Sequence, residues 1–438
     1  MPDNPGMSRR KLIGLGAATV AATALPDALF RLSTAAAAAG PTDGIGYFAR
    51  FGVTEKMLRD GLAAALSRGA EYADLFFQHR VSNSFGLEDG EVNRAYTNVD
   101  LGVGVRAVKG DQTGYAYTED LTPEALVRAA KTAAAIADGP AKPGPKGLKV
   151  DASLPARYPV KTRWEDVRPQ QKLPLLSGLN EKVFAADKRI TKVNVFFGDE
   201  AGAILIADST GRVVEDVQPM TVLGLSCVAE HEGKKETNGY NVAGRADIGF
   251  YSPERLDRIV KEAVSRTVVL FDAVQPPAGE MPVVLGAGAS GILLHEAIGH
   301  GMEADFNRKG ISIFADRIGK PVAQKFVSIV DEGTIPAARG AVNVDDEGNA
   351  VGKTMLVTNG ILTSYMHDSI SAKHYKVKPT GNGRRESYAY APVPRMRATY
   401  MLPGPHKKEE IIASVKKGIF CTNFTNGQVQ IGAGDFTF

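Results

Sequence analysis

The sequence predicts an α+β fold in which helices and antiparallel strands occupy three successive segments. Stretches of helical periodicity flank runs of β-forming residues that alternate between polar and glycine-containing breaks. The strand candidates follow one another directly, without the strand–helix–strand series of a parallel sheet. We therefore expect a helix with an antiparallel meander first, a mixed central segment next, and a β-rich C-terminal domain last.

Composition restricts the class of protein. With 438 residues, 44% hydrophobic and 23% charged, the chain is long enough for two or three domains around sizeable cores. Its 52 basic and 49 acidic residues give a net charge of only +3, too balanced to attract nucleic acid or an anionic membrane. Two cysteines form neither a disulfide framework nor a zinc ribbon. Any metal site must therefore use histidine and carboxylate, with at most one thiolate.

Residues 1–39 predict an export signal. Arg9 and Arg10 precede an apolar run over residues 12–25 and an alanine-rich stretch over residues 35–39, the order of a basic, an apolar and a cleavage region. The run is shorter than the roughly 20 residues that span a bilayer, so we expect no stable membrane insertion. The arginine pair resembles a twin-arginine signal, which implies a periplasmic location. The alternative is a basic amphipathic starting helix.

An N-terminal domain is predicted over residues 40–145. Helical spacing covers residues 54–68, with Thr54 as a plausible N-cap. The strand candidates of the meander are residues 72–80, 84–88, 91–97, 101–108 and 112–118. A second helix over residues 123–137 ends before a linker rich in glycine and proline at residues 139–145, which sets the boundary.

The central domain is predicted over residues 146–278. It opens and closes with helices, near residues 170–186 and 253–270. Between them lie strand candidates at residues 191–198, 203–208, 213–217 and 220–229. The prolines of residues 273–279 cannot extend the last helix, because they lack an amide hydrogen, and so they mark the second boundary.

The C-terminal domain, residues 279–438, consists mainly of short β-runs and turns. Asn359-Gly360 between two such runs is a strong hairpin signal. The stretch Asp345-Asp346-Glu347-Gly348 lacks the spaced ligands of a calcium loop, so we expect a hairpin turn there.

The same domain contains the most informative motif, His295-Glu296-Ala297-Ile298-Gly299-His300. Imidazole nitrogens are good zinc ligands, and a carboxylate beside the ion can take a proton from water and later protonate a leaving amine. This composition predicts a metal-dependent hydrolytic site, with Glu296 as general base.

The spacing of the two histidines constrains the local backbone. At about 3.6 residues per turn, a separation of five turns the second side chain by roughly 140° from the first, so a regular helix cannot present both to one ion. The helix must end or be distorted. Gly299 and Gly301 would make such a departure easy, and a π-bulge would serve equally well. The alternative is two structural histidines on a buried helix.

Three stretches of the C-terminal domain resemble the TldD/PmbA family of metalloproteases, and specifically its TldD-type member with an HExxxH motif. They are residues 294–314, residues 381–388 with Pro394-Arg395-Met396, and residues 427–430 with 435–438. The resemblance extends over roughly residues 50–438.

This resemblance implies His295 and His300 as zinc ligands and Glu296 as the general base. It also implies a third ligand, a cysteine downstream of the stretch that matches residues 435–438, where the given sequence ends. Either the protein is shorter than its relatives or the sequence is a fragment. Cys421 is a weak substitute, more readily interpreted as a buried, inert thiol.

Several further polar residues have two possible interpretations each. Glu303 and Asp305 either accept a hydrogen bond from a ligand imidazole or form a solvated acidic pair. The loop residues Arg384, Arg385 and Glu386 either hold a peptide carbonyl or terminus or form a surface ion-pair cluster. We interpret the remaining downstream histidines as ordinary surface or core residues: His367, His374 and His406.

The leading functional hypothesis is a zinc-dependent metallopeptidase that hydrolyses unfolded or modified peptides. The resemblance implies a dimer, with itself or with a PmbA-type paralogue, that encloses the site. A β-rich domain would suit an extended peptide bound by strand addition. The alternative is a non-catalytic subunit or peptide-binding scaffold of a similar assembly.

Overall fold

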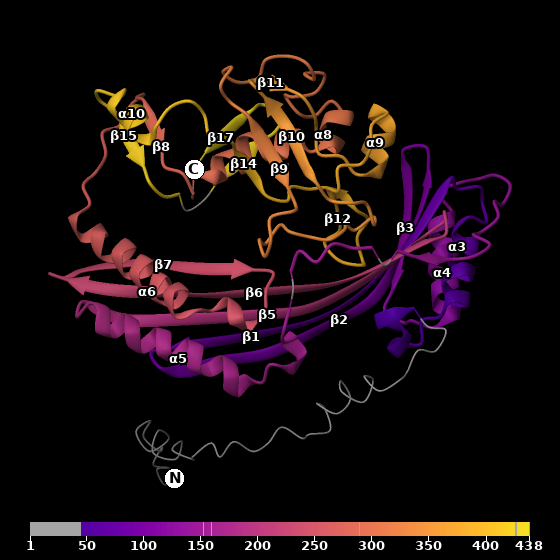
Figure 1. Ribbon diagram of the computed structural model, residues 1–438, viewed down its shortest axis with the longest axis horizontal. Coiled ribbons are helices and arrows are strands. Elements are labelled where there is room, and N and C mark those ends of the chain that lie inside the picture. Colours follow the sequence, from indigo (N-terminus) through magenta and orange to yellow (C-terminus); the bar gives the residue numbers. More distant parts are fainter. Residues whose placement is uncertain (1–44, 152, 159, 289, 425–426, 438) are drawn as a thin grey trace, which may run out of the picture.

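The computed structural model describes residues 45–437, except residues 152, 159, 289 and 425–426. A long curved sheet forms the centre of the molecule. Helices cover one face of this sheet, and the C-terminal segment lies over the other (Figure 1). This arrangement confirms the predicted α+β class with antiparallel sheets.

The central sheet has seven strands in the order β3-β2-β1-β5-β6-β4, with β7 also paired to β6. All pairs are antiparallel except β4 with β6. The strands are β1 (Tyr72–Glu88), β2 (Glu91–Lys109), β3 (Gln112–Thr118), β4 (Lys149–Val150), β5 (Ile190–Asp208), β6 (Arg212–His231) and β7 (Lys234–Gly244). Because β1 pairs with β5 from Asp74↔Asp208 to Glu88↔Asn194, the linker at residues 139–145 does not separate two sheets.

The strands are longer than the sequence indicates. The expected breaks at residues 81–83 and 98–100 lie inside β1 and β2, and those at residues 199–202 and 218–219 lie inside β5 and β6. Pro219 is accommodated because the side of β6 facing away from β5 has no strand there: β7 pairing begins at Thr221, and β4 pairing ends at Val213. Strand β7 was not predicted.

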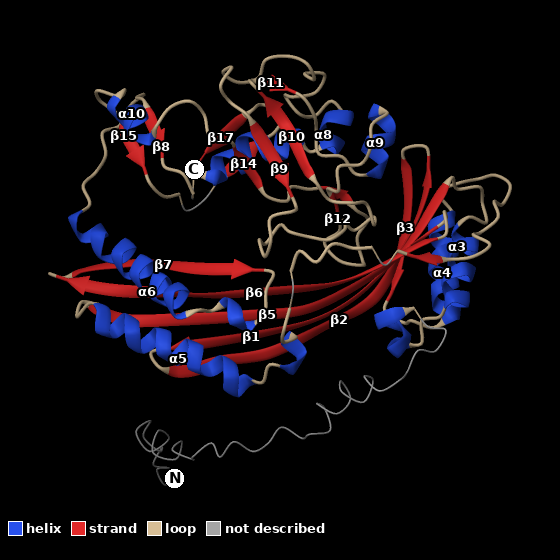
Figure 2. Cartoon of the chain, in the orientation of Figure 1, coloured by secondary structure: helices blue, strands red, loops and turns tan. Residues whose placement is uncertain are grey.

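Helices pack on one face of the sheet (Figure 2). They are α3 (Glu55–Ala65), α4 (Pro123–Ala134), α5 (Pro169–Ala186) and α6 (Pro253–Val268). The hydroxyl oxygen of Thr54 accepts a hydrogen bond from the backbone N–H of Met57, so the predicted N-cap of α3 is present. Leu62 and Leu126 share one core with strands β1 and β2, and Leu179 and Ile259 share a second with β5 and β6.

The C-terminal segment consists of short elements. Its strands are β8 (Val283–Leu285), β9 (Ile329–Glu332), β10 (Lys353–Thr358), β11 (Ile361–Leu362), β12 (Gly383–Arg384), β13 (Val393–Pro394), β14 (Thr399–Met401), β15 (Ile419–Cys421), β16 (Gln428–Gln430) and β17 (Asp435–Thr437). Its α-helices are α7 (Gly291–Leu293), α8 (Ala304–Arg308), α9 (Ser369–Tyr375) and α10 (Lys408–Ala413). The expected hairpin is present, with Asn359 and Gly360 at φ 49° and 79° between β10 and β11.

A buried chain of charges joins this segment to the central sheet. Asp74 of β1 accepts hydrogen bonds from Arg106 of β2 and, at 2.7 Å, from Arg385. Arg106 also donates to Glu347, at 2.7 Å. Each of these side chains is almost completely buried. Removing any one of these side chains would leave a buried charge without one of its partners. This set of buried charges therefore fixes the C-terminal segment on the sheet.

The structure corrects one sequence expectation about this segment and contains the turn expected in another. Arg385 forms neither a surface ion-pair cluster nor a peptide-binding group, because its guanidinium is occupied by Asp74, Tyr115 and Tyr390. The stretch containing Glu347 is a turn, as expected, closed by hydrogen bonds between Asp345 and Asn349. Within this turn, the side chains of Asp345 and Glu347 are buried.

Candidate metal centre

The HExxxH motif lies on a π-helix. Residues Leu294–Gly299 have this conformation, and the backbone N–H of His300 donates to the carbonyl oxygen of His295. Hydrogen bonds between residues five apart place those residues one turn apart. His295 and His300 therefore share one face of the turn, which a regular α-helix would not allow.

The motif side chains converge. One ring nitrogen from each of His295 and His300 and one carboxylate oxygen of Glu296 lie within 4.8 Å of one another. The two imidazole rings are 4.6 Å apart between centroids and nearly perpendicular, at 82°. Within the described ranges, no other group of three histidine, cysteine or acidic side chains meets this criterion. The two ring nitrogens could bind a zinc ion, and the carboxylate would then lie beside that ion.

The glycines of the motif provide space, which corrects the expectation that they provide conformational freedom. Gly299 has φ −58° and ψ −58°, ordinary helical values. A Cβ atom there would overlap the sulfur of Met396, and one on Gly301 would lie 2.7 Å from the Phe314 ring. Glycine thus allows the π-turn to pack closely against its neighbours.

Glu303 links the second histidine to an arginine. Its Oε2 atom lies 3.3 Å from Nδ1 of His300 and accepts a hydrogen bond of 3.1 Å from Nη1 of Arg395. The Glu303 side chain is completely buried. The sequence allowed two interpretations of Glu303, and the structure shows the first, a hydrogen-bond partner of the His300 imidazole. Asp305 makes no hydrogen bond to either histidine in the described part of the chain.

These contacts shift the pKa values of the two histidines in opposite directions. Burial, followed by the nearby His300, lowers the pKa of His295. The hydrogen bond to Glu303 raises the pKa of His300, against the opposing effect of burial. The neutral form of His295, which has a free lone pair for a metal, is therefore favoured. His300 must lose the proton on Nε2 before that nitrogen can bind an ion, while its Nδ1–H donates to Glu303.

A cavity of about 470 Å³ opens beside the motif. Its walls come from the motif, from α8, from the end of β13 and from β16. The lining residues are Glu296, His300, Glu303, Phe306, Arg395, Gln428, Val429 and Ile431. A peptide segment placed there would lie next to both the carboxylate and the second histidine.

Neither cysteine joins the cluster. Cys421 lies in β15, paired with Leu285 of β8, and is partly exposed, which differs from the buried thiol expected from the sequence. Cys227 is buried in β6, where burial raises the pKa of its thiol. His367 is a buried core residue, and burial lowers its pKa to about 4.

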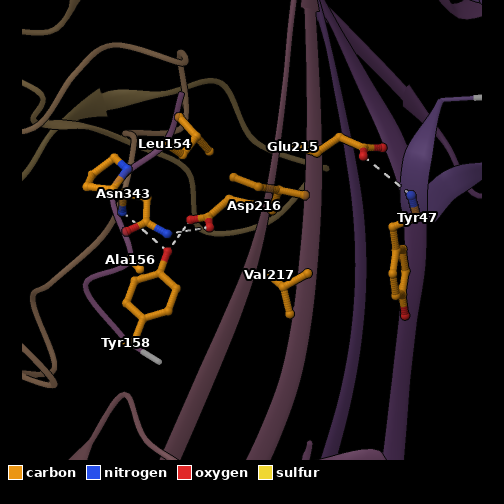
Figure 3. A pocket seen from close by; sticks show the side chains of 10 residues that line it. Tyr47, Leu154, Ala156, Tyr158, Glu215, Asp216, Val217 and Asn343 are labelled. Carbon is orange, nitrogen blue, oxygen red and sulfur yellow. Dashed lines mark hydrogen bonds between the residues drawn. The ribbon is translucent and has the colours of Figure 1, made fainter. Parts of the chain in front are cut away.

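A second cavity, of about 330 Å³, lies beside β6 and contains none of the motif residues in its lining (Figure 3). The carboxylate of Asp216 accepts hydrogen bonds there from the hydroxyl of Tyr158 and from Asn343. Glu215 points the other way and accepts from the backbone N–H of Tyr47. These carboxylates have structural partners, so the cavity offers no catalytic set.

Comparisons with known proteins identify the family. The chain is 40% identical to the metalloprotease TldD homologue of Haemophilus influenzae over 380 residues, which are 85% of this chain and 78% of that protein. The chain belongs to the PmbA/TldA metallopeptidase family. The family's domain 1 matches residues 73–137, its central domain residues 162–271 and its C-terminal domain residues 278–438.

Two further proteins extend the comparison. The zinc metalloprotease TldD homologue of Saccharolobus solfataricus is 24% identical over 84% of this chain and 81% of its own length. The crystal structure of TldE from Thermococcus kodakarensis superimposes with a TM-score of 0.66, covering 86% of this chain and 83% of that one at 18% identity. The latter likeness supports the fold.

The predicted periplasmic location is wrong. The relatives that overturn it, such as the Haemophilus influenzae protein, are TldD homologues. The twin-arginine-like segment that motivated the prediction lies outside the described residues. In the described part of the chain, no helix is both long enough and apolar enough to cross a membrane.

Proposed function

We propose that this chain is a zinc-dependent peptidase of the TldD type, with its reaction centre at His295, Glu296 and His300. The observation that carries the proposal is the π-turn, which brings two imidazole nitrogens and a carboxylate oxygen within 4.8 Å. A distortion of this kind disrupts regular helical bonding, and π-turns occur frequently at functional sites. Two merely structural histidines would not require it.

His295 and His300 would hold the zinc ion through their ring nitrogens. When bound, zinc supplies a Lewis acid that lowers the pKa of a water molecule to about 7. Glu296 accepts a proton from the attacking water, whose oxygen forms a bond to the peptide carbonyl carbon. The C–N bond then breaks, and Glu296 transfers the same proton to the leaving amine nitrogen, which regenerates the carboxylate.

Unfolded or modified peptides are the proposed substrates. An open cavity of about 470 Å³ beside Glu296 would accept a short extended segment, whereas a folded domain would be too large. A dimer, with a second copy or with a PmbA-type paralogue, would enclose this cavity. The fold shared with TldE supports such an assembly.

The second candidate is a non-catalytic subunit or peptide-binding scaffold. It is favoured by the absence of a cysteine near the two histidines among the described residues. Zinc content discriminates between the two candidates. The enzyme predicts about one zinc per chain and hydrolysis of an unfolded protein such as casein. The scaffold would be supported if the chain bound no zinc and left casein intact, both alone and in the presence of a paralogue.

A further inference from the structure

We infer that Arg395 binds the carbonyl oxygen of the scissile peptide bond and stabilises the negative charge that develops there. The inference rests on the proposed peptidase function. Arg395 lines the same cavity as Glu296 and His300, and 37% of its side chain is exposed. Its role would be to supply a fixed hydrogen-bond donor beside the reacting carbonyl.

The backbone of Arg395 is held rigidly. Its N–H donates to the carbonyl oxygen of Asn382, at 2.9 Å, and its own carbonyl oxygen accepts from the amide of Asn382, also at 2.9 Å. The amide of Asn382 donates in addition to the buried Asp331, at 2.7 Å. A donor that is positioned before the substrate arrives loses little free energy to reorganisation during the reaction.

The guanidinium of Arg395 is only partly occupied. Nη1 donates to Glu303, at 3.1 Å, and to the carbonyl oxygen of Pro394, at 2.7 Å. Nε and Nη2 have no hydrogen-bond partner among the described residues. Glu303 therefore anchors one side of the guanidinium and leaves donors available to the cavity. The same Glu303 oxygen faces His300, which fixes the arginine relative to the predicted zinc ligand.

The groups around Arg395 hold it as a hydrogen-bond donor. Glu303 is paired with its guanidinium, and both Asp305 and Arg384 are close enough for its charge to act on them. A carbonyl oxygen becomes negative only as water attacks, so a donor held in this way would bind it most tightly in the transition state.

The test compares Arg395→Met and Arg395→Lys with Arg308→Met. Arg308 is a matched control, since it pairs with Asp111 and does not line the cavity. We expect Arg395→Met to lower kcat about 100-fold, the typical cost of losing one such donor, with KM nearly unchanged. Arg395→Lys should lose less, because one donor and the charge remain. The Arg308 variant should retain wild-type kcat, and all variants should retain their zinc.

A second readout does not depend on turnover. A phosphinic peptide carries anionic oxygens where the reacting carbonyl would be, whereas an ordinary peptide does not. In a Glu296→Gln background, Arg395→Met should weaken binding of the phosphinic peptide about 100-fold and leave binding of the ordinary peptide almost unchanged. Equal weakening of both would overturn the inference, because Arg395 would then act in uniform substrate binding.

The remaining outcomes are also decisive. An increase in KM seen only with free-acid peptides, and not with their C-terminal amides, would show that Arg395 binds a terminal carboxylate. Loss of zinc from the Arg395 variants would show a structural role. Unchanged kcat in both Arg395 variants would refute this inference alone, whereas a wild-type chain that binds zinc neither alone nor with a paralogue and cleaves nothing would refute the proposed function as well.

Discussion

His295 and His300 are five residues apart in sequence, yet their rings lie 4.6 Å apart because a π-turn places them on one face. The close packing of Gly299 against Met396 accompanies this turn. The site thus depends on a local backbone distortion and on the neighbours that accommodate it.

Gly299→Ala should disturb the turn. Its new methyl group would overlap the sulfur of Met396, so either that side chain or the π-turn must shift. We expect zinc affinity to fall at least about tenfold, the loss typical when ligand orientation is disturbed. Gly291→Ala is the control, because a Cβ atom there meets no atom within 4 Å. Zinc competition with a chelator measures both variants, and equal affinities would contradict the proposed packing role.

Glu303→Gln should weaken zinc binding without unfolding the protein. The buried carboxylate orients His300, and outer partners of ligand histidines typically contribute about 10- to 100-fold in metal affinity. Asp305→Asn is the matched control, since Asp305 has no hydrogen bond to a histidine in the described chain. Chelator competition again gives the affinities. A larger loss in the control would mean that Glu303 is not the residue that orients His300.

The convergence of His295 and His300 could be anticipated from the composition of the motif together with the family resemblance, whereas the spacing alone left two structural histidines as an alternative. The contact between Glu303 and Arg395 could not, since 92 residues separate them and their meeting depends on where β13 lies. Arg395 lies in one of the stretches that resemble the family. Neither its residue type nor the prolines that precede it indicated its partner. The buried position of Arg385 was missed for the same reason, because its partner Asp74 comes from the first strand of the sheet.

The limits of the strands were also poorly predicted. The break expected at residues 98–100, Asn-Val-Asp, lies inside β2, and the unpredicted β7 begins with Lys-Lys-Glu-Thr-Asn. Such residues do not favour strands by their own propensity; they form strands here because neighbouring strands supply the backbone partners. The helices were predicted more accurately, since their apolar periodicity and N-caps are local.

Arg385→Met should lower the free energy of unfolding, because it weakens the packing of the C-terminal segment on the sheet. It would remove one of the two arginines that bind the buried Asp74, and breaking a buried pair costs about 3–5 kcal/mol. Lys182→Met, which breaks the exposed pair with Asp257, should change stability little. Denaturant unfolding compares the two. A loss no larger than that of the control would show that Arg385 does not fix the segment.

Stability should fall as the pH rises from about 4 to above 6. Burial, and then the nearby charge of Glu347, raise the pKa of Asp368 from 3.8 to about 6. The folded state therefore keeps a proton that the unfolded state loses, and this contribution disappears as the pH passes the folded pKa. Asp368→Asn retains the N-cap of α9 and removes the titration, so it should flatten the profile by on the order of 1 kcal/mol. Thermal unfolding across this range, with Asp60→Asn as an exposed control, gives the result; an unchanged slope in Asp368→Asn would assign the effect elsewhere.

The most direct test of the proposed site is peptide hydrolysis by Glu296→Gln, purified with its zinc content measured. The glutamine preserves the shape of the side chain but cannot accept the proton from water. We expect zinc per chain to equal that of the wild type and the rate of casein cleavage to fall by about two to four orders of magnitude. Full activity in this variant, with zinc bound, would contradict the assignment of Glu296 as the general base and with it the proposed reaction.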